Sequence, residues 1–265
     1  MHQMRFKPKK RLGQNFLVER SIREKIVLAL DLKKEDVVLE IGSGKGELTS
    51  LLAEKAKCVY ALEIDAELCG HLLDLARLRP NIKVVHRDIL GLNLKNYFCG
   101  TKKKIRVAGN IPYYISTPII THLFHYRKQI RDIFMTVQKE FAHRLAASPG
   151  SPDYSSLSCF VQYYAECQIL FSIKKGSFFP VPKVDSSFIR LRIRRTPLVH
   201  PRNEKLFFKI IRAAFNQRRK TLRNSLEGIL SREQLERYFE ANGLDRNARP
   251  ETLSLEDFSR LAKIS

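Results

Sequence analysis

The fold is decided by one stretch of the sequence, VVLEIGSGKG at residues 37–46. Its first half is mainly apolar and β-branched, which is typical of a buried strand in a parallel sheet. Glycines then alternate with serine and lysine, and a helical pattern begins near Glu47. Glycines let the backbone approach a ligand, and a helix N-terminus attracts anionic groups. The stretch therefore predicts a strand, a turn that holds a nucleotide-like ligand, and a helix.

Further apolar runs follow this strand. They predict strands at residues 58–62, 82–86, 105–108 and 133–137, separated by helical patterns such as residues 66–78. This alternation indicates βαβ units and a parallel sheet. Two later strand-like segments, residues 163–173 and 187–194, have no helix between them and predict an antiparallel pair. We therefore expect an α/β fold with a Rossmann-like seven-stranded sheet, mostly parallel, with an antiparallel terminal hairpin.

The pattern changes after Pro197. Helical spacing then covers residues 204–215, 220–230, 232–241 and 254–263, with breaks at Gly243 and Pro250. We predict two domains: a sheet domain with a basic N-terminal leader at residues 1–196, and a small helical domain at residues 197–265. One amphipathic helix, residues 18–30, is expected ahead of the sheet.

Charge is the unusual feature of the composition. The chain has 48 Lys and Arg against 27 Asp and Glu, a formal net charge of +21 and a pI near 10.0. Such a charge favours a polyanionic partner, because neutralising phosphates releases counterions. A generally basic proteome and an anionic membrane surface are the alternatives, but we find no isolated basic amphipathic helix and no membrane-length apolar stretch. Nucleic acid is the expected partner.

The five cysteines are scattered and form no C-x-x-C pair or zinc-ligand spacing, so we expect reduced thiols, a cytoplasmic location and no metal. His122 and His125 share a predicted helix face, but no carboxylate or thiol is placed to complete a metal site. A monomer is expected, because the sequence has no heptad seam.

The glycine spacing and two acids narrow the ligand class. A dinucleotide fingerprint needs a glycine where this chain has Glu47, and a P-loop needs Gly-Lys-Ser/Thr. Glu63 ends the second predicted strand and Asp88 follows the third, at the sheet edge where ligands bind. One carboxylate can accept from ribose hydroxyls and the other from an adenine amino group. These residues favour an adenosine-containing cofactor; Asp65 is an alternative acid, and a tight turn without a ligand is the alternative for the glycines.

The tetrapeptide Asn110-Ile111-Pro112-Tyr113 follows the fourth predicted strand at the same edge. The side-chain oxygen of Asn110 and the carbonyl of Ile111 can accept the hydrogens of an exocyclic amine and orient its lone pair. Pro112 stiffens the turn, and Tyr113 offers a stacking face for an extruded base. These residues fit adenine or cytosine in DNA or RNA. The alternative is a proline turn whose tyrosine fills the core.

Six segments of the chain resemble the ribosomal RNA adenine dimethyltransferases, which comprise small-subunit enzymes and macrolide-resistance relatives. The segments are residues 13–17, 40–46, 110–118, 138–140, 178–184 and 217–224. The resemblance implies direct methyl transfer from S-adenosyl-L-methionine to N6 of two adjacent adenosines near the 3′ end of 16S rRNA. It also implies small-subunit rRNA or an immature 30S subunit as partner, and identifies the first domain as the methyltransferase domain.

The resemblance also assigns residues. It implies cofactor contacts from Asn15, Leu17, Gly42, Glu63, Asp88 and Asn110, and catalytic roles for Asn110, Ile111, Pro112 and Tyr113, with Phe178 as the second wall of a base clamp. Ser43 and Tyr114 depart from the usual proline and asparagine, and Lys45 is more typical of the resistance enzymes. A 23S rRNA methyltransferase is therefore one alternative function, and a non-catalytic assembly or transcription factor is another.

Basic side chains crowd three places. Arg218, Arg219, Lys220 and Arg223 lie at the start of a predicted C-terminal helix, and we expect them to contact RNA. The leader carries Lys7, Lys9, Lys10 and Arg11, and the last predicted strand carries Arg190, Arg192 and Arg194 on one face. For these two groups, RNA contact and an ordinary solvated face are both open.

Overall fold

The computed structural model describes residues 8–98, 103–216 and 220–264. The chain forms two compact units, each made of two segments: Met1–Ala142 with Gln168–Ile193, and His143–Cys167 with Arg194–Ser265. The second unit thus takes in residues 143–167 together with the C-terminal part of the chain. The domain boundary at residue 196 stays a prediction.

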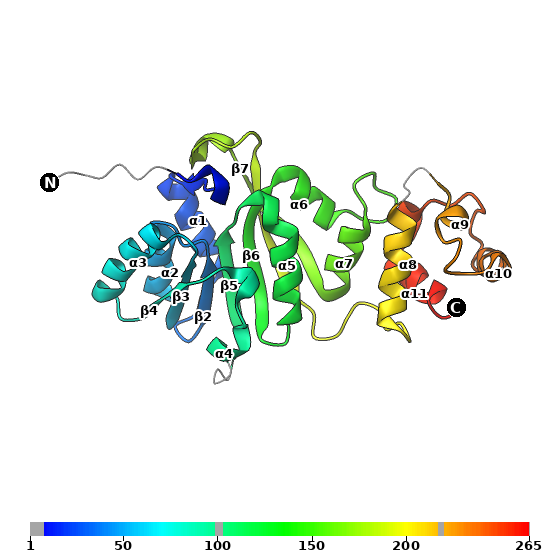
Figure 1. The fold of residues 1–265 in the computed structure, drawn as a ribbon, viewed down its shortest axis with the longest axis horizontal. Helices are drawn as coiled ribbons and strands as arrows, with labels where there is room; N and C mark the ends of the chain where they lie inside the picture. Colours follow the sequence, from blue (N-terminus) through cyan, green and yellow to red (C-terminus); the bar gives the residue numbers. More distant parts are fainter. Residues whose placement is uncertain (1–7, 99–102, 217–219, 265) are drawn as a thin grey trace. The chain divides into compact units, whose positions relative to one another are not determined.

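A seven-stranded sheet forms the centre of the first unit (Figure 1). Its strands are β2 (Val37–Ile41), β3 (Cys58–Glu63), β4 (Ile82–His86), β5 (Ile105–Asn110), β6 (Ile130–Gln138), β7 (Ala165–Ile173) and β9 (Ser186–Ile193). Their order is β4-β3-β2-β5-β6-β9-β7. The first five strands in this order are parallel, and β9 runs antiparallel to β6. The mostly parallel α/β sheet predicted from the sequence is confirmed.

Helices between the strands bury apolar stripes against the sheet. They are α1 (Arg20–Leu30), α2 (Glu47–Lys55), α3 (Ala66–Leu78), α4 (Leu94–Phe98) and α5 (Ser116–His125), whereas α6 (Lys139–Ala146) begins in the first unit and ends in the second. Leu30, Leu52 and Leu72 from the first three helices join Val59 and Ala108 of the sheet in one hydrophobic core. This packing fixes the strand ends, and with them the turns that follow each strand.

A second, two-stranded sheet was not predicted from the sequence. It pairs β1 (Phe16–Leu17) antiparallel with β8 (Phe178–Phe179), so that Phe16 lies opposite Phe179 and Leu17 opposite Phe178. Two residues are too short for a recognisable alternating pattern. The pairing brings the leader beside a segment about 160 residues away in the sequence.

The second unit contains α7 (Ser156–Tyr164), α8 (Glu204–Asn216), α9 (Leu222–Ser225), α10 (Arg232–Asn242) and α11 (Leu255–Leu261). Two predictions are corrected here. Residues 163 and 164 end a helix rather than begin a strand, and the helix expected over residues 220–230 covers only α9. Thr221 caps α9 at its start, and Gly228 adopts a φ of +82° shortly after its end, which no continuing helix allows.

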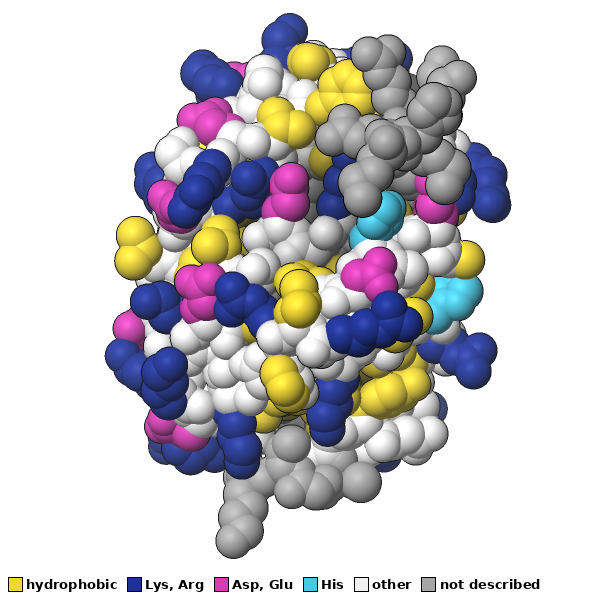
Figure 2. Space-filling view, turned by 90° about the vertical axis from the view of Figure 1, so that its left-hand side faces the viewer, with side chains coloured by type: hydrophobic (Ala, Val, Ile, Leu, Met, Phe, Trp, Pro, Cys, Tyr) yellow, Lys and Arg dark blue, Asp and Glu magenta, His cyan; other side chains and the backbone are white. Residues whose placement is uncertain are grey.

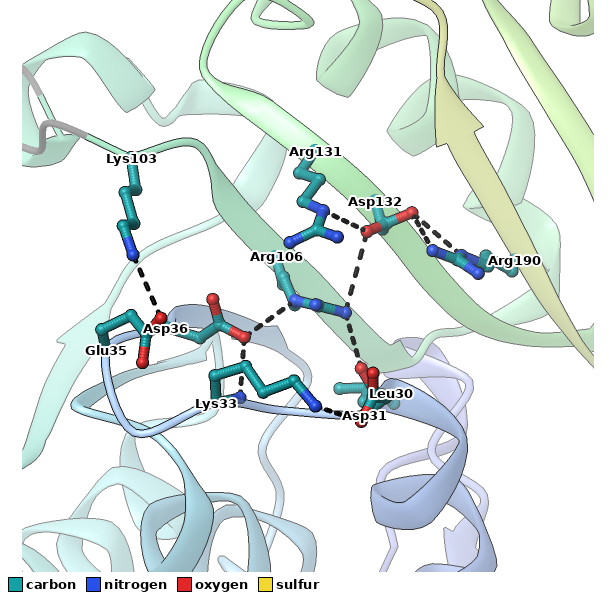
Figure 3. Close-up of polar contacts among 10 residues, drawn as sticks. All are labelled: Leu30, Asp31, Lys33, Glu35, Asp36, Lys103, Arg106, Arg131, Asp132 and Arg190. Atoms are coloured by element: carbon teal, nitrogen blue, oxygen red, sulfur yellow. Dashed lines mark hydrogen bonds and ion pairs between the residues drawn. The ribbon is translucent and has the colours of Figure 1, made fainter.

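The amino end of the sheet holds a buried ion network (Figure 3). Arg106 of β5 contacts Asp36 at 3.1 Å and Asp132 of β6 at 3.7 Å, and donates to the carbonyl of Leu30 at 2.6 Å. Arg190 of β9 pairs with the other oxygen of Asp132 at 2.8 Å. Asp132 is fully buried. The network ties the end of α1, the start of β2 and three strands together.

Candidate active site

A pocket lies at the carboxyl ends of β4, β3, β2 and β5. The turn after each strand contributes to its lining, which includes Gly42 and Gly44, Glu63 and Ile64, Arg87 and Asp88, and Asn110 to Tyr113. Leader residues 12–16 line it as well. The structure therefore brings Asn15, Gly42, Glu63, Asp88 and Asn110 around one space, although they are spread over nearly 100 positions of the sequence.

The turn between β2 and α2 depends on its glycines. Gly44 has φ +56° and Gly46 has φ +82°, a backbone region that L side chains rarely adopt. A Cβ at Gly44 would also lie 3.1 Å from the ring of Phe16, and one at Gly46 would lie 2.8 Å from Leu75. Other residues at these positions would strain the turn and push apart the walls of the pocket.

The two candidate acids at the end of β3, Glu63 and Asp65, have different surroundings in the structure. Glu63 lines the pocket and is 6% exposed. Its side chain accepts backbone N–H groups from Gly44 at 2.9 Å, Ile64 at 2.9 Å and Asp65 at 3.0 Å, which fix its position. The carboxylate of Asp65 is instead engaged by Lys9 and Gln14 of the leader. Of the two acids, Glu63 is therefore the one that lines the pocket.

Asp88 caps a short turn and also lines the pocket. Its side chain accepts from the backbone N–H of Leu90 at 2.9 Å and so caps the short 3₁₀ turn Ile89–Gly91. The residue also lines the pocket. Because a carboxylate has several acceptor sites, capping leaves capacity for an amino group.

Asn110 ends β5, and its amide orientation is fixed by the leader. The amide nitrogen donates to the backbone carbonyl of Asn15 at 2.7 Å. A carbonyl can only accept, so the nitrogen must face Asn15 and the side-chain oxygen must lie on the other branch of the amide. Ile111 follows with a buried side chain, and Pro112 has a φ of −59°. Two acceptor oxygens are thus held on a stiff turn.

Tyr113 is held by a residue that the sequence analysis missed. Its hydroxyl lies 2.6 Å from the hydroxyl of Ser186, a fully buried residue at the start of β9. Burial raises the pKa of Tyr113, against the smaller opposing effect of the Ser186 hydrogen bond. The phenol is therefore neutral and tethered, and its ring is half-buried in the pocket wall.

Phe178 and Phe179 occupy opposite faces of β8. Phe178 is 1% exposed and belongs to the core with Leu17, whereas Phe179 is 58% exposed. Directly paired residues of neighbouring strands share a face, so Phe179 lies on the face of Phe16, a pocket residue. Phe178 is not part of the pocket lining, and Leu17 lines an adjoining pocket that shares Gly42, Gly44 and Asn110 with it. The clamp role of Phe178 and the cofactor contact of Leu17 stay predictions.

The expected RNA-binding residues are only partly described. Arg218 and Arg219 lie outside the described residues, Lys220 is exposed, and Arg223 pairs with Glu236 at 3.1 Å. Of the other basic groups, Lys9 pairs with Asp65 and Arg190 with Asp132. Figure 2 shows the face of the first unit on the α3 side, where basic side chains alternate with acidic ones. That face carries no separate basic patch among the side chains visible there.

His122 and His125 contact backbone carbonyls, those of Leu92 at 3.0 Å and Thr121 at 2.9 Å. Within residues 8–98, 103–216 and 220–264, no group of three or more His, Cys, Asp and Glu could hold a metal ion. The four cysteines in the same ranges are free thiols, and no helix there is long and apolar enough to cross a membrane.

Comparison with known proteins supports one family. The family model described as "Ribosomal RNA adenine dimethylase" matches residues 5–265. A protein named "Ribosomal RNA small subunit methyltransferase A" from Clostridium acetobutylicum is 42% identical over 258 residues, covering 97% of this chain and 93% of the relative. The protein of the same name from Geobacillus thermodenitrificans is 42% identical over 265 residues, covering 97% and 90%.

Two solved structures resemble the whole chain. A dimethyladenosine transferase from Plasmodium falciparum has a TM-score of 0.77 and 26% identity, and the match covers 93% of this chain and 95% of that one. The 23S rRNA methyltransferase ErmE has a TM-score of 0.75 and 27% identity, with 94% and 98% covered.

Proposed function

The chain belongs to the ribosomal RNA adenine dimethylase family, and from that premise we propose that it dimethylates N6 of two adjacent adenosines in a loop near the 3′ end of 16S rRNA. It is an S-adenosylmethionine-dependent methyltransferase. The small-subunit target is favoured over the 23S alternative, because relatives at 42% identity carry a small-subunit name, whereas ErmE is 27% identical. The intact acids and tetrapeptide disfavour a non-catalytic factor.

The pocket residues fit the cofactor. When bound, S-adenosylmethionine supplies an electrophilic methyl group. Glu63 is positioned to accept from ribose hydroxyls, and Asp88 from an adenine amino group, since both are carboxylates at the pocket wall. Gly42 and Gly44 let the backbone of the turn approach the ligand.

The target amine is oriented by the chain itself. The side-chain oxygen of Asn110 and the backbone carbonyl of Ile111 accept its two hydrogens, which directs the nitrogen lone pair away from the ring. The Asn15 contact holds the Asn110 amide in the required orientation before substrate arrives. This preset amide, beside Glu63 and Asp88 in one pocket, is the observation on which the proposal depends most.

The extruded adenine stacks on Tyr113, which Ser186 and Pro112 hold in place. The second wall comes from β8. Phe178 takes this role if its ring leaves the core, and otherwise the exposed ring of Phe179 is the aromatic group available. Methyl transfer per folded molecule should fall in whichever of F178A and F179A removes the stacking ring. The free energy of unfolding is measured beside it, because F178A should also destabilise the core.

The partner is an immature 30S subunit or its rRNA, contacted through the basic stretch that contains Arg218, Arg219, Lys220 and Arg223. The enzyme works as a monomer in the cytoplasm. Its affinity for RNA should fall steeply as the salt concentration rises, because each phosphate contact releases counterions.

The test compares substrates with methyl-tritiated S-adenosylmethionine. Unmethylated small subunits should become labelled at two adjacent adenosines as dimethyladenosine, while fully methylated small subunits, the matched control, should not. Label confined to large-subunit RNA would assign the chain to the resistance type. Cofactor binding without any transfer would overturn the enzymatic proposal.

A further inference from the structure

The leader segment, residues 8–17, crosses the candidate cofactor pocket. Leu12 to Phe16 contribute to its lining, although the rest of the pocket comes from the turns of the sheet. The segment has a two-residue strand and a 3₁₀ turn of three residues, Lys10–Leu12, as its only regular structure. Its pairing with β8 and its contacts with the turns of the sheet therefore hold it in place.

One end of the leader packs on the catalytic turn. A Cβ at Gly13 would lie 2.9 Å from the ring of Tyr114 and 3.2 Å from Pro112, and Gly13 has a φ of +60°. The carbonyl of Asn15 accepts from the amide of Asn110. Displacement of the leader would therefore open the pocket and also release the Asn110 amide.

Asp65 holds the leader at two further points, Lys9 and Gln14. Asp65 is 3% exposed and accepts from Lys9 Nζ at 2.6 Å and from Gln14 Nε2 at 3.0 Å. The side-chain oxygen of Gln14 accepts from the backbone N–H of Lys9 at 2.7 Å, which closes a triangle of three residues. Burial alone would raise the pKa of Asp65, but hydrogen bonds from Lys9 and Gln14 outweigh it and lower the pKa.

Asp65 also belongs to the turn that carries the proposed ribose acceptor. Its backbone N–H donates to Glu63 at 3.0 Å, and its side chain caps α3 by accepting from the N–H of Glu67 at 3.1 Å. One short turn thus holds the ligand-facing acid and the anchor of the leader.

We propose that Asp65 is a positioning residue that fastens the leader segment over the adenosine pocket and thereby sets how long a bound adenosyl cofactor is retained. This inference rests on the proposed function. Asp65 itself touches neither cofactor nor substrate. Each methyl transfer requires exchange of the spent cofactor, and the segment that Asp65 fastens forms part of the wall of the pocket that the cofactor leaves.

The variant that tests this is Asp65→Asn, because asparagine still caps a helix but removes the charge that pairs with Lys9. We expect dissociation of S-adenosylhomocysteine from the purified full-length chain to become about 10-fold faster, as charge-assisted hydrogen bonds are lost. KM for S-adenosylmethionine should rise by a similar factor, and the KM for RNA should stay nearly unchanged. Because the leader also holds the Asn110 amide, kcat should fall as well, but by less than in Asn110→Ala. Lys9→Met should give the same result, and adding it to Asp65→Asn should have little further effect.

Glu67→Gln is the matched control, because Glu67 lies 3.6 Å from Lys9 but is half-exposed and does not contact Gln14. It should leave S-adenosylhomocysteine dissociation unchanged. Trypsin supplies an independent readout: cleavage after Lys10 and Arg11, with no cofactor or RNA present, should be faster in Asp65→Asn than in the wild type and Glu67→Gln.

Unchanged dissociation and unchanged cleavage in Asp65→Asn would overturn the inference, and so would an equal effect of Glu67→Gln. Failure of the proposed function would look different. In that case the wild type would transfer no methyl group to small subunits, while trypsin would still distinguish Asp65→Asn from the wild type.

Discussion

The two ends of the same parallel sheet treat buried polar groups in opposite ways. At the amino end, Arg106, Asp36, Asp132 and Arg190 are joined in ion pairs with one another (Figure 3). At the carboxyl end, Glu63 and Asn110 are anchored by backbone groups but keep acceptor atoms at a pocket. The difference teaches that burial and charge do not mark a functional site. What marks it is a fixed polar group that faces a pocket instead of an opposite charge of the protein itself.

The comparison predicts that damage at the amino end affects stability alone. Asp132→Ala leaves Arg106 with one carboxylate fewer and Arg190 without its partner, so it should lower the free energy of unfolding by roughly 3–5 kcal/mol. Denaturant titration measures this loss, and methyl transfer per folded molecule should not change. Glu35→Gln, the control, removes an exposed ion pair with Lys103 and should leave the denaturation midpoint unchanged. A specific loss of catalysis in Asp132→Ala would break the comparison.

Damage at the carboxyl end should do the reverse. Asn110→Ala removes one acceptor for the target amine, so kcat should fall by about 10²–10³-fold, roughly 3–4 kcal/mol of transition-state stabilisation. Single-turnover methylation measures the fall, while RNA binding and the unfolding midpoint report any general damage. Turnover near the wild-type level would remove Asn110 from the proposed mechanism.

Glu40 tests whether a carboxylate near the pocket can also be structural. It lies in β2 beneath the glycine turn, and burial raises its pKa to about 7, against hydrogen bonds from Thr49 and Ser43. Between pH 4.5 and 7 the unfolded chain loses this proton first, so this contribution to stability is complete at low pH and lost by about pH 7. Relative to Glu40→Gln, the wild type should lose roughly 3 kcal/mol over this range.

Denaturant titrations of the wild type and Glu40→Gln at pH 5 and pH 8 check this prediction. Parallel pH profiles for the two proteins would mean that Glu40 titrates normally, and would leave the carboxyl end without a structural acid of this kind.

Ser186 should give the smallest effect. Ser186→Ala removes the 2.6 Å contact to the Tyr113 hydroxyl, so the ring loses its tether but remains in place. We expect kcat/KM for RNA to fall about 10-fold, roughly 1.4 kcal/mol, with KM for the cofactor unchanged. Tyr113→Phe is the matched variant: it removes the same contact from the other side and should behave alike. A larger effect of Tyr113→Phe would assign the hydroxyl a role beyond positioning.

Much of this site follows from local sequence, because Gly42, Glu63, Asp88 and Asn110 lie at or just after the ends of strands. The runs at residues 37–41 and 82–86 match β2 and β4, and residues 66–78 match α3. Parallel strands end at one edge, so Glu63, Asp88 and Asn110 could be expected there together. By contrast, the sequence did not predict that Arg190 pairs with Asp132, since Asp132 lies 58 residues away and falls outside the predicted strand.

The sequence by itself determined the α/β fold, the ligand-binding edge and the tetrapeptide that ends β5. These features depend on short-range patterns of apolar, glycine and acidic residues. Only the tertiary structure showed that Glu63 lines the pocket while Asp65 holds the leader. It also placed Ser186 behind Tyr113, and put Phe178 in the core with Phe179 outside. Each of these depends on contacts between distant segments, because the pairing of β1 with β8 and the course of the leader arise only when the chain packs.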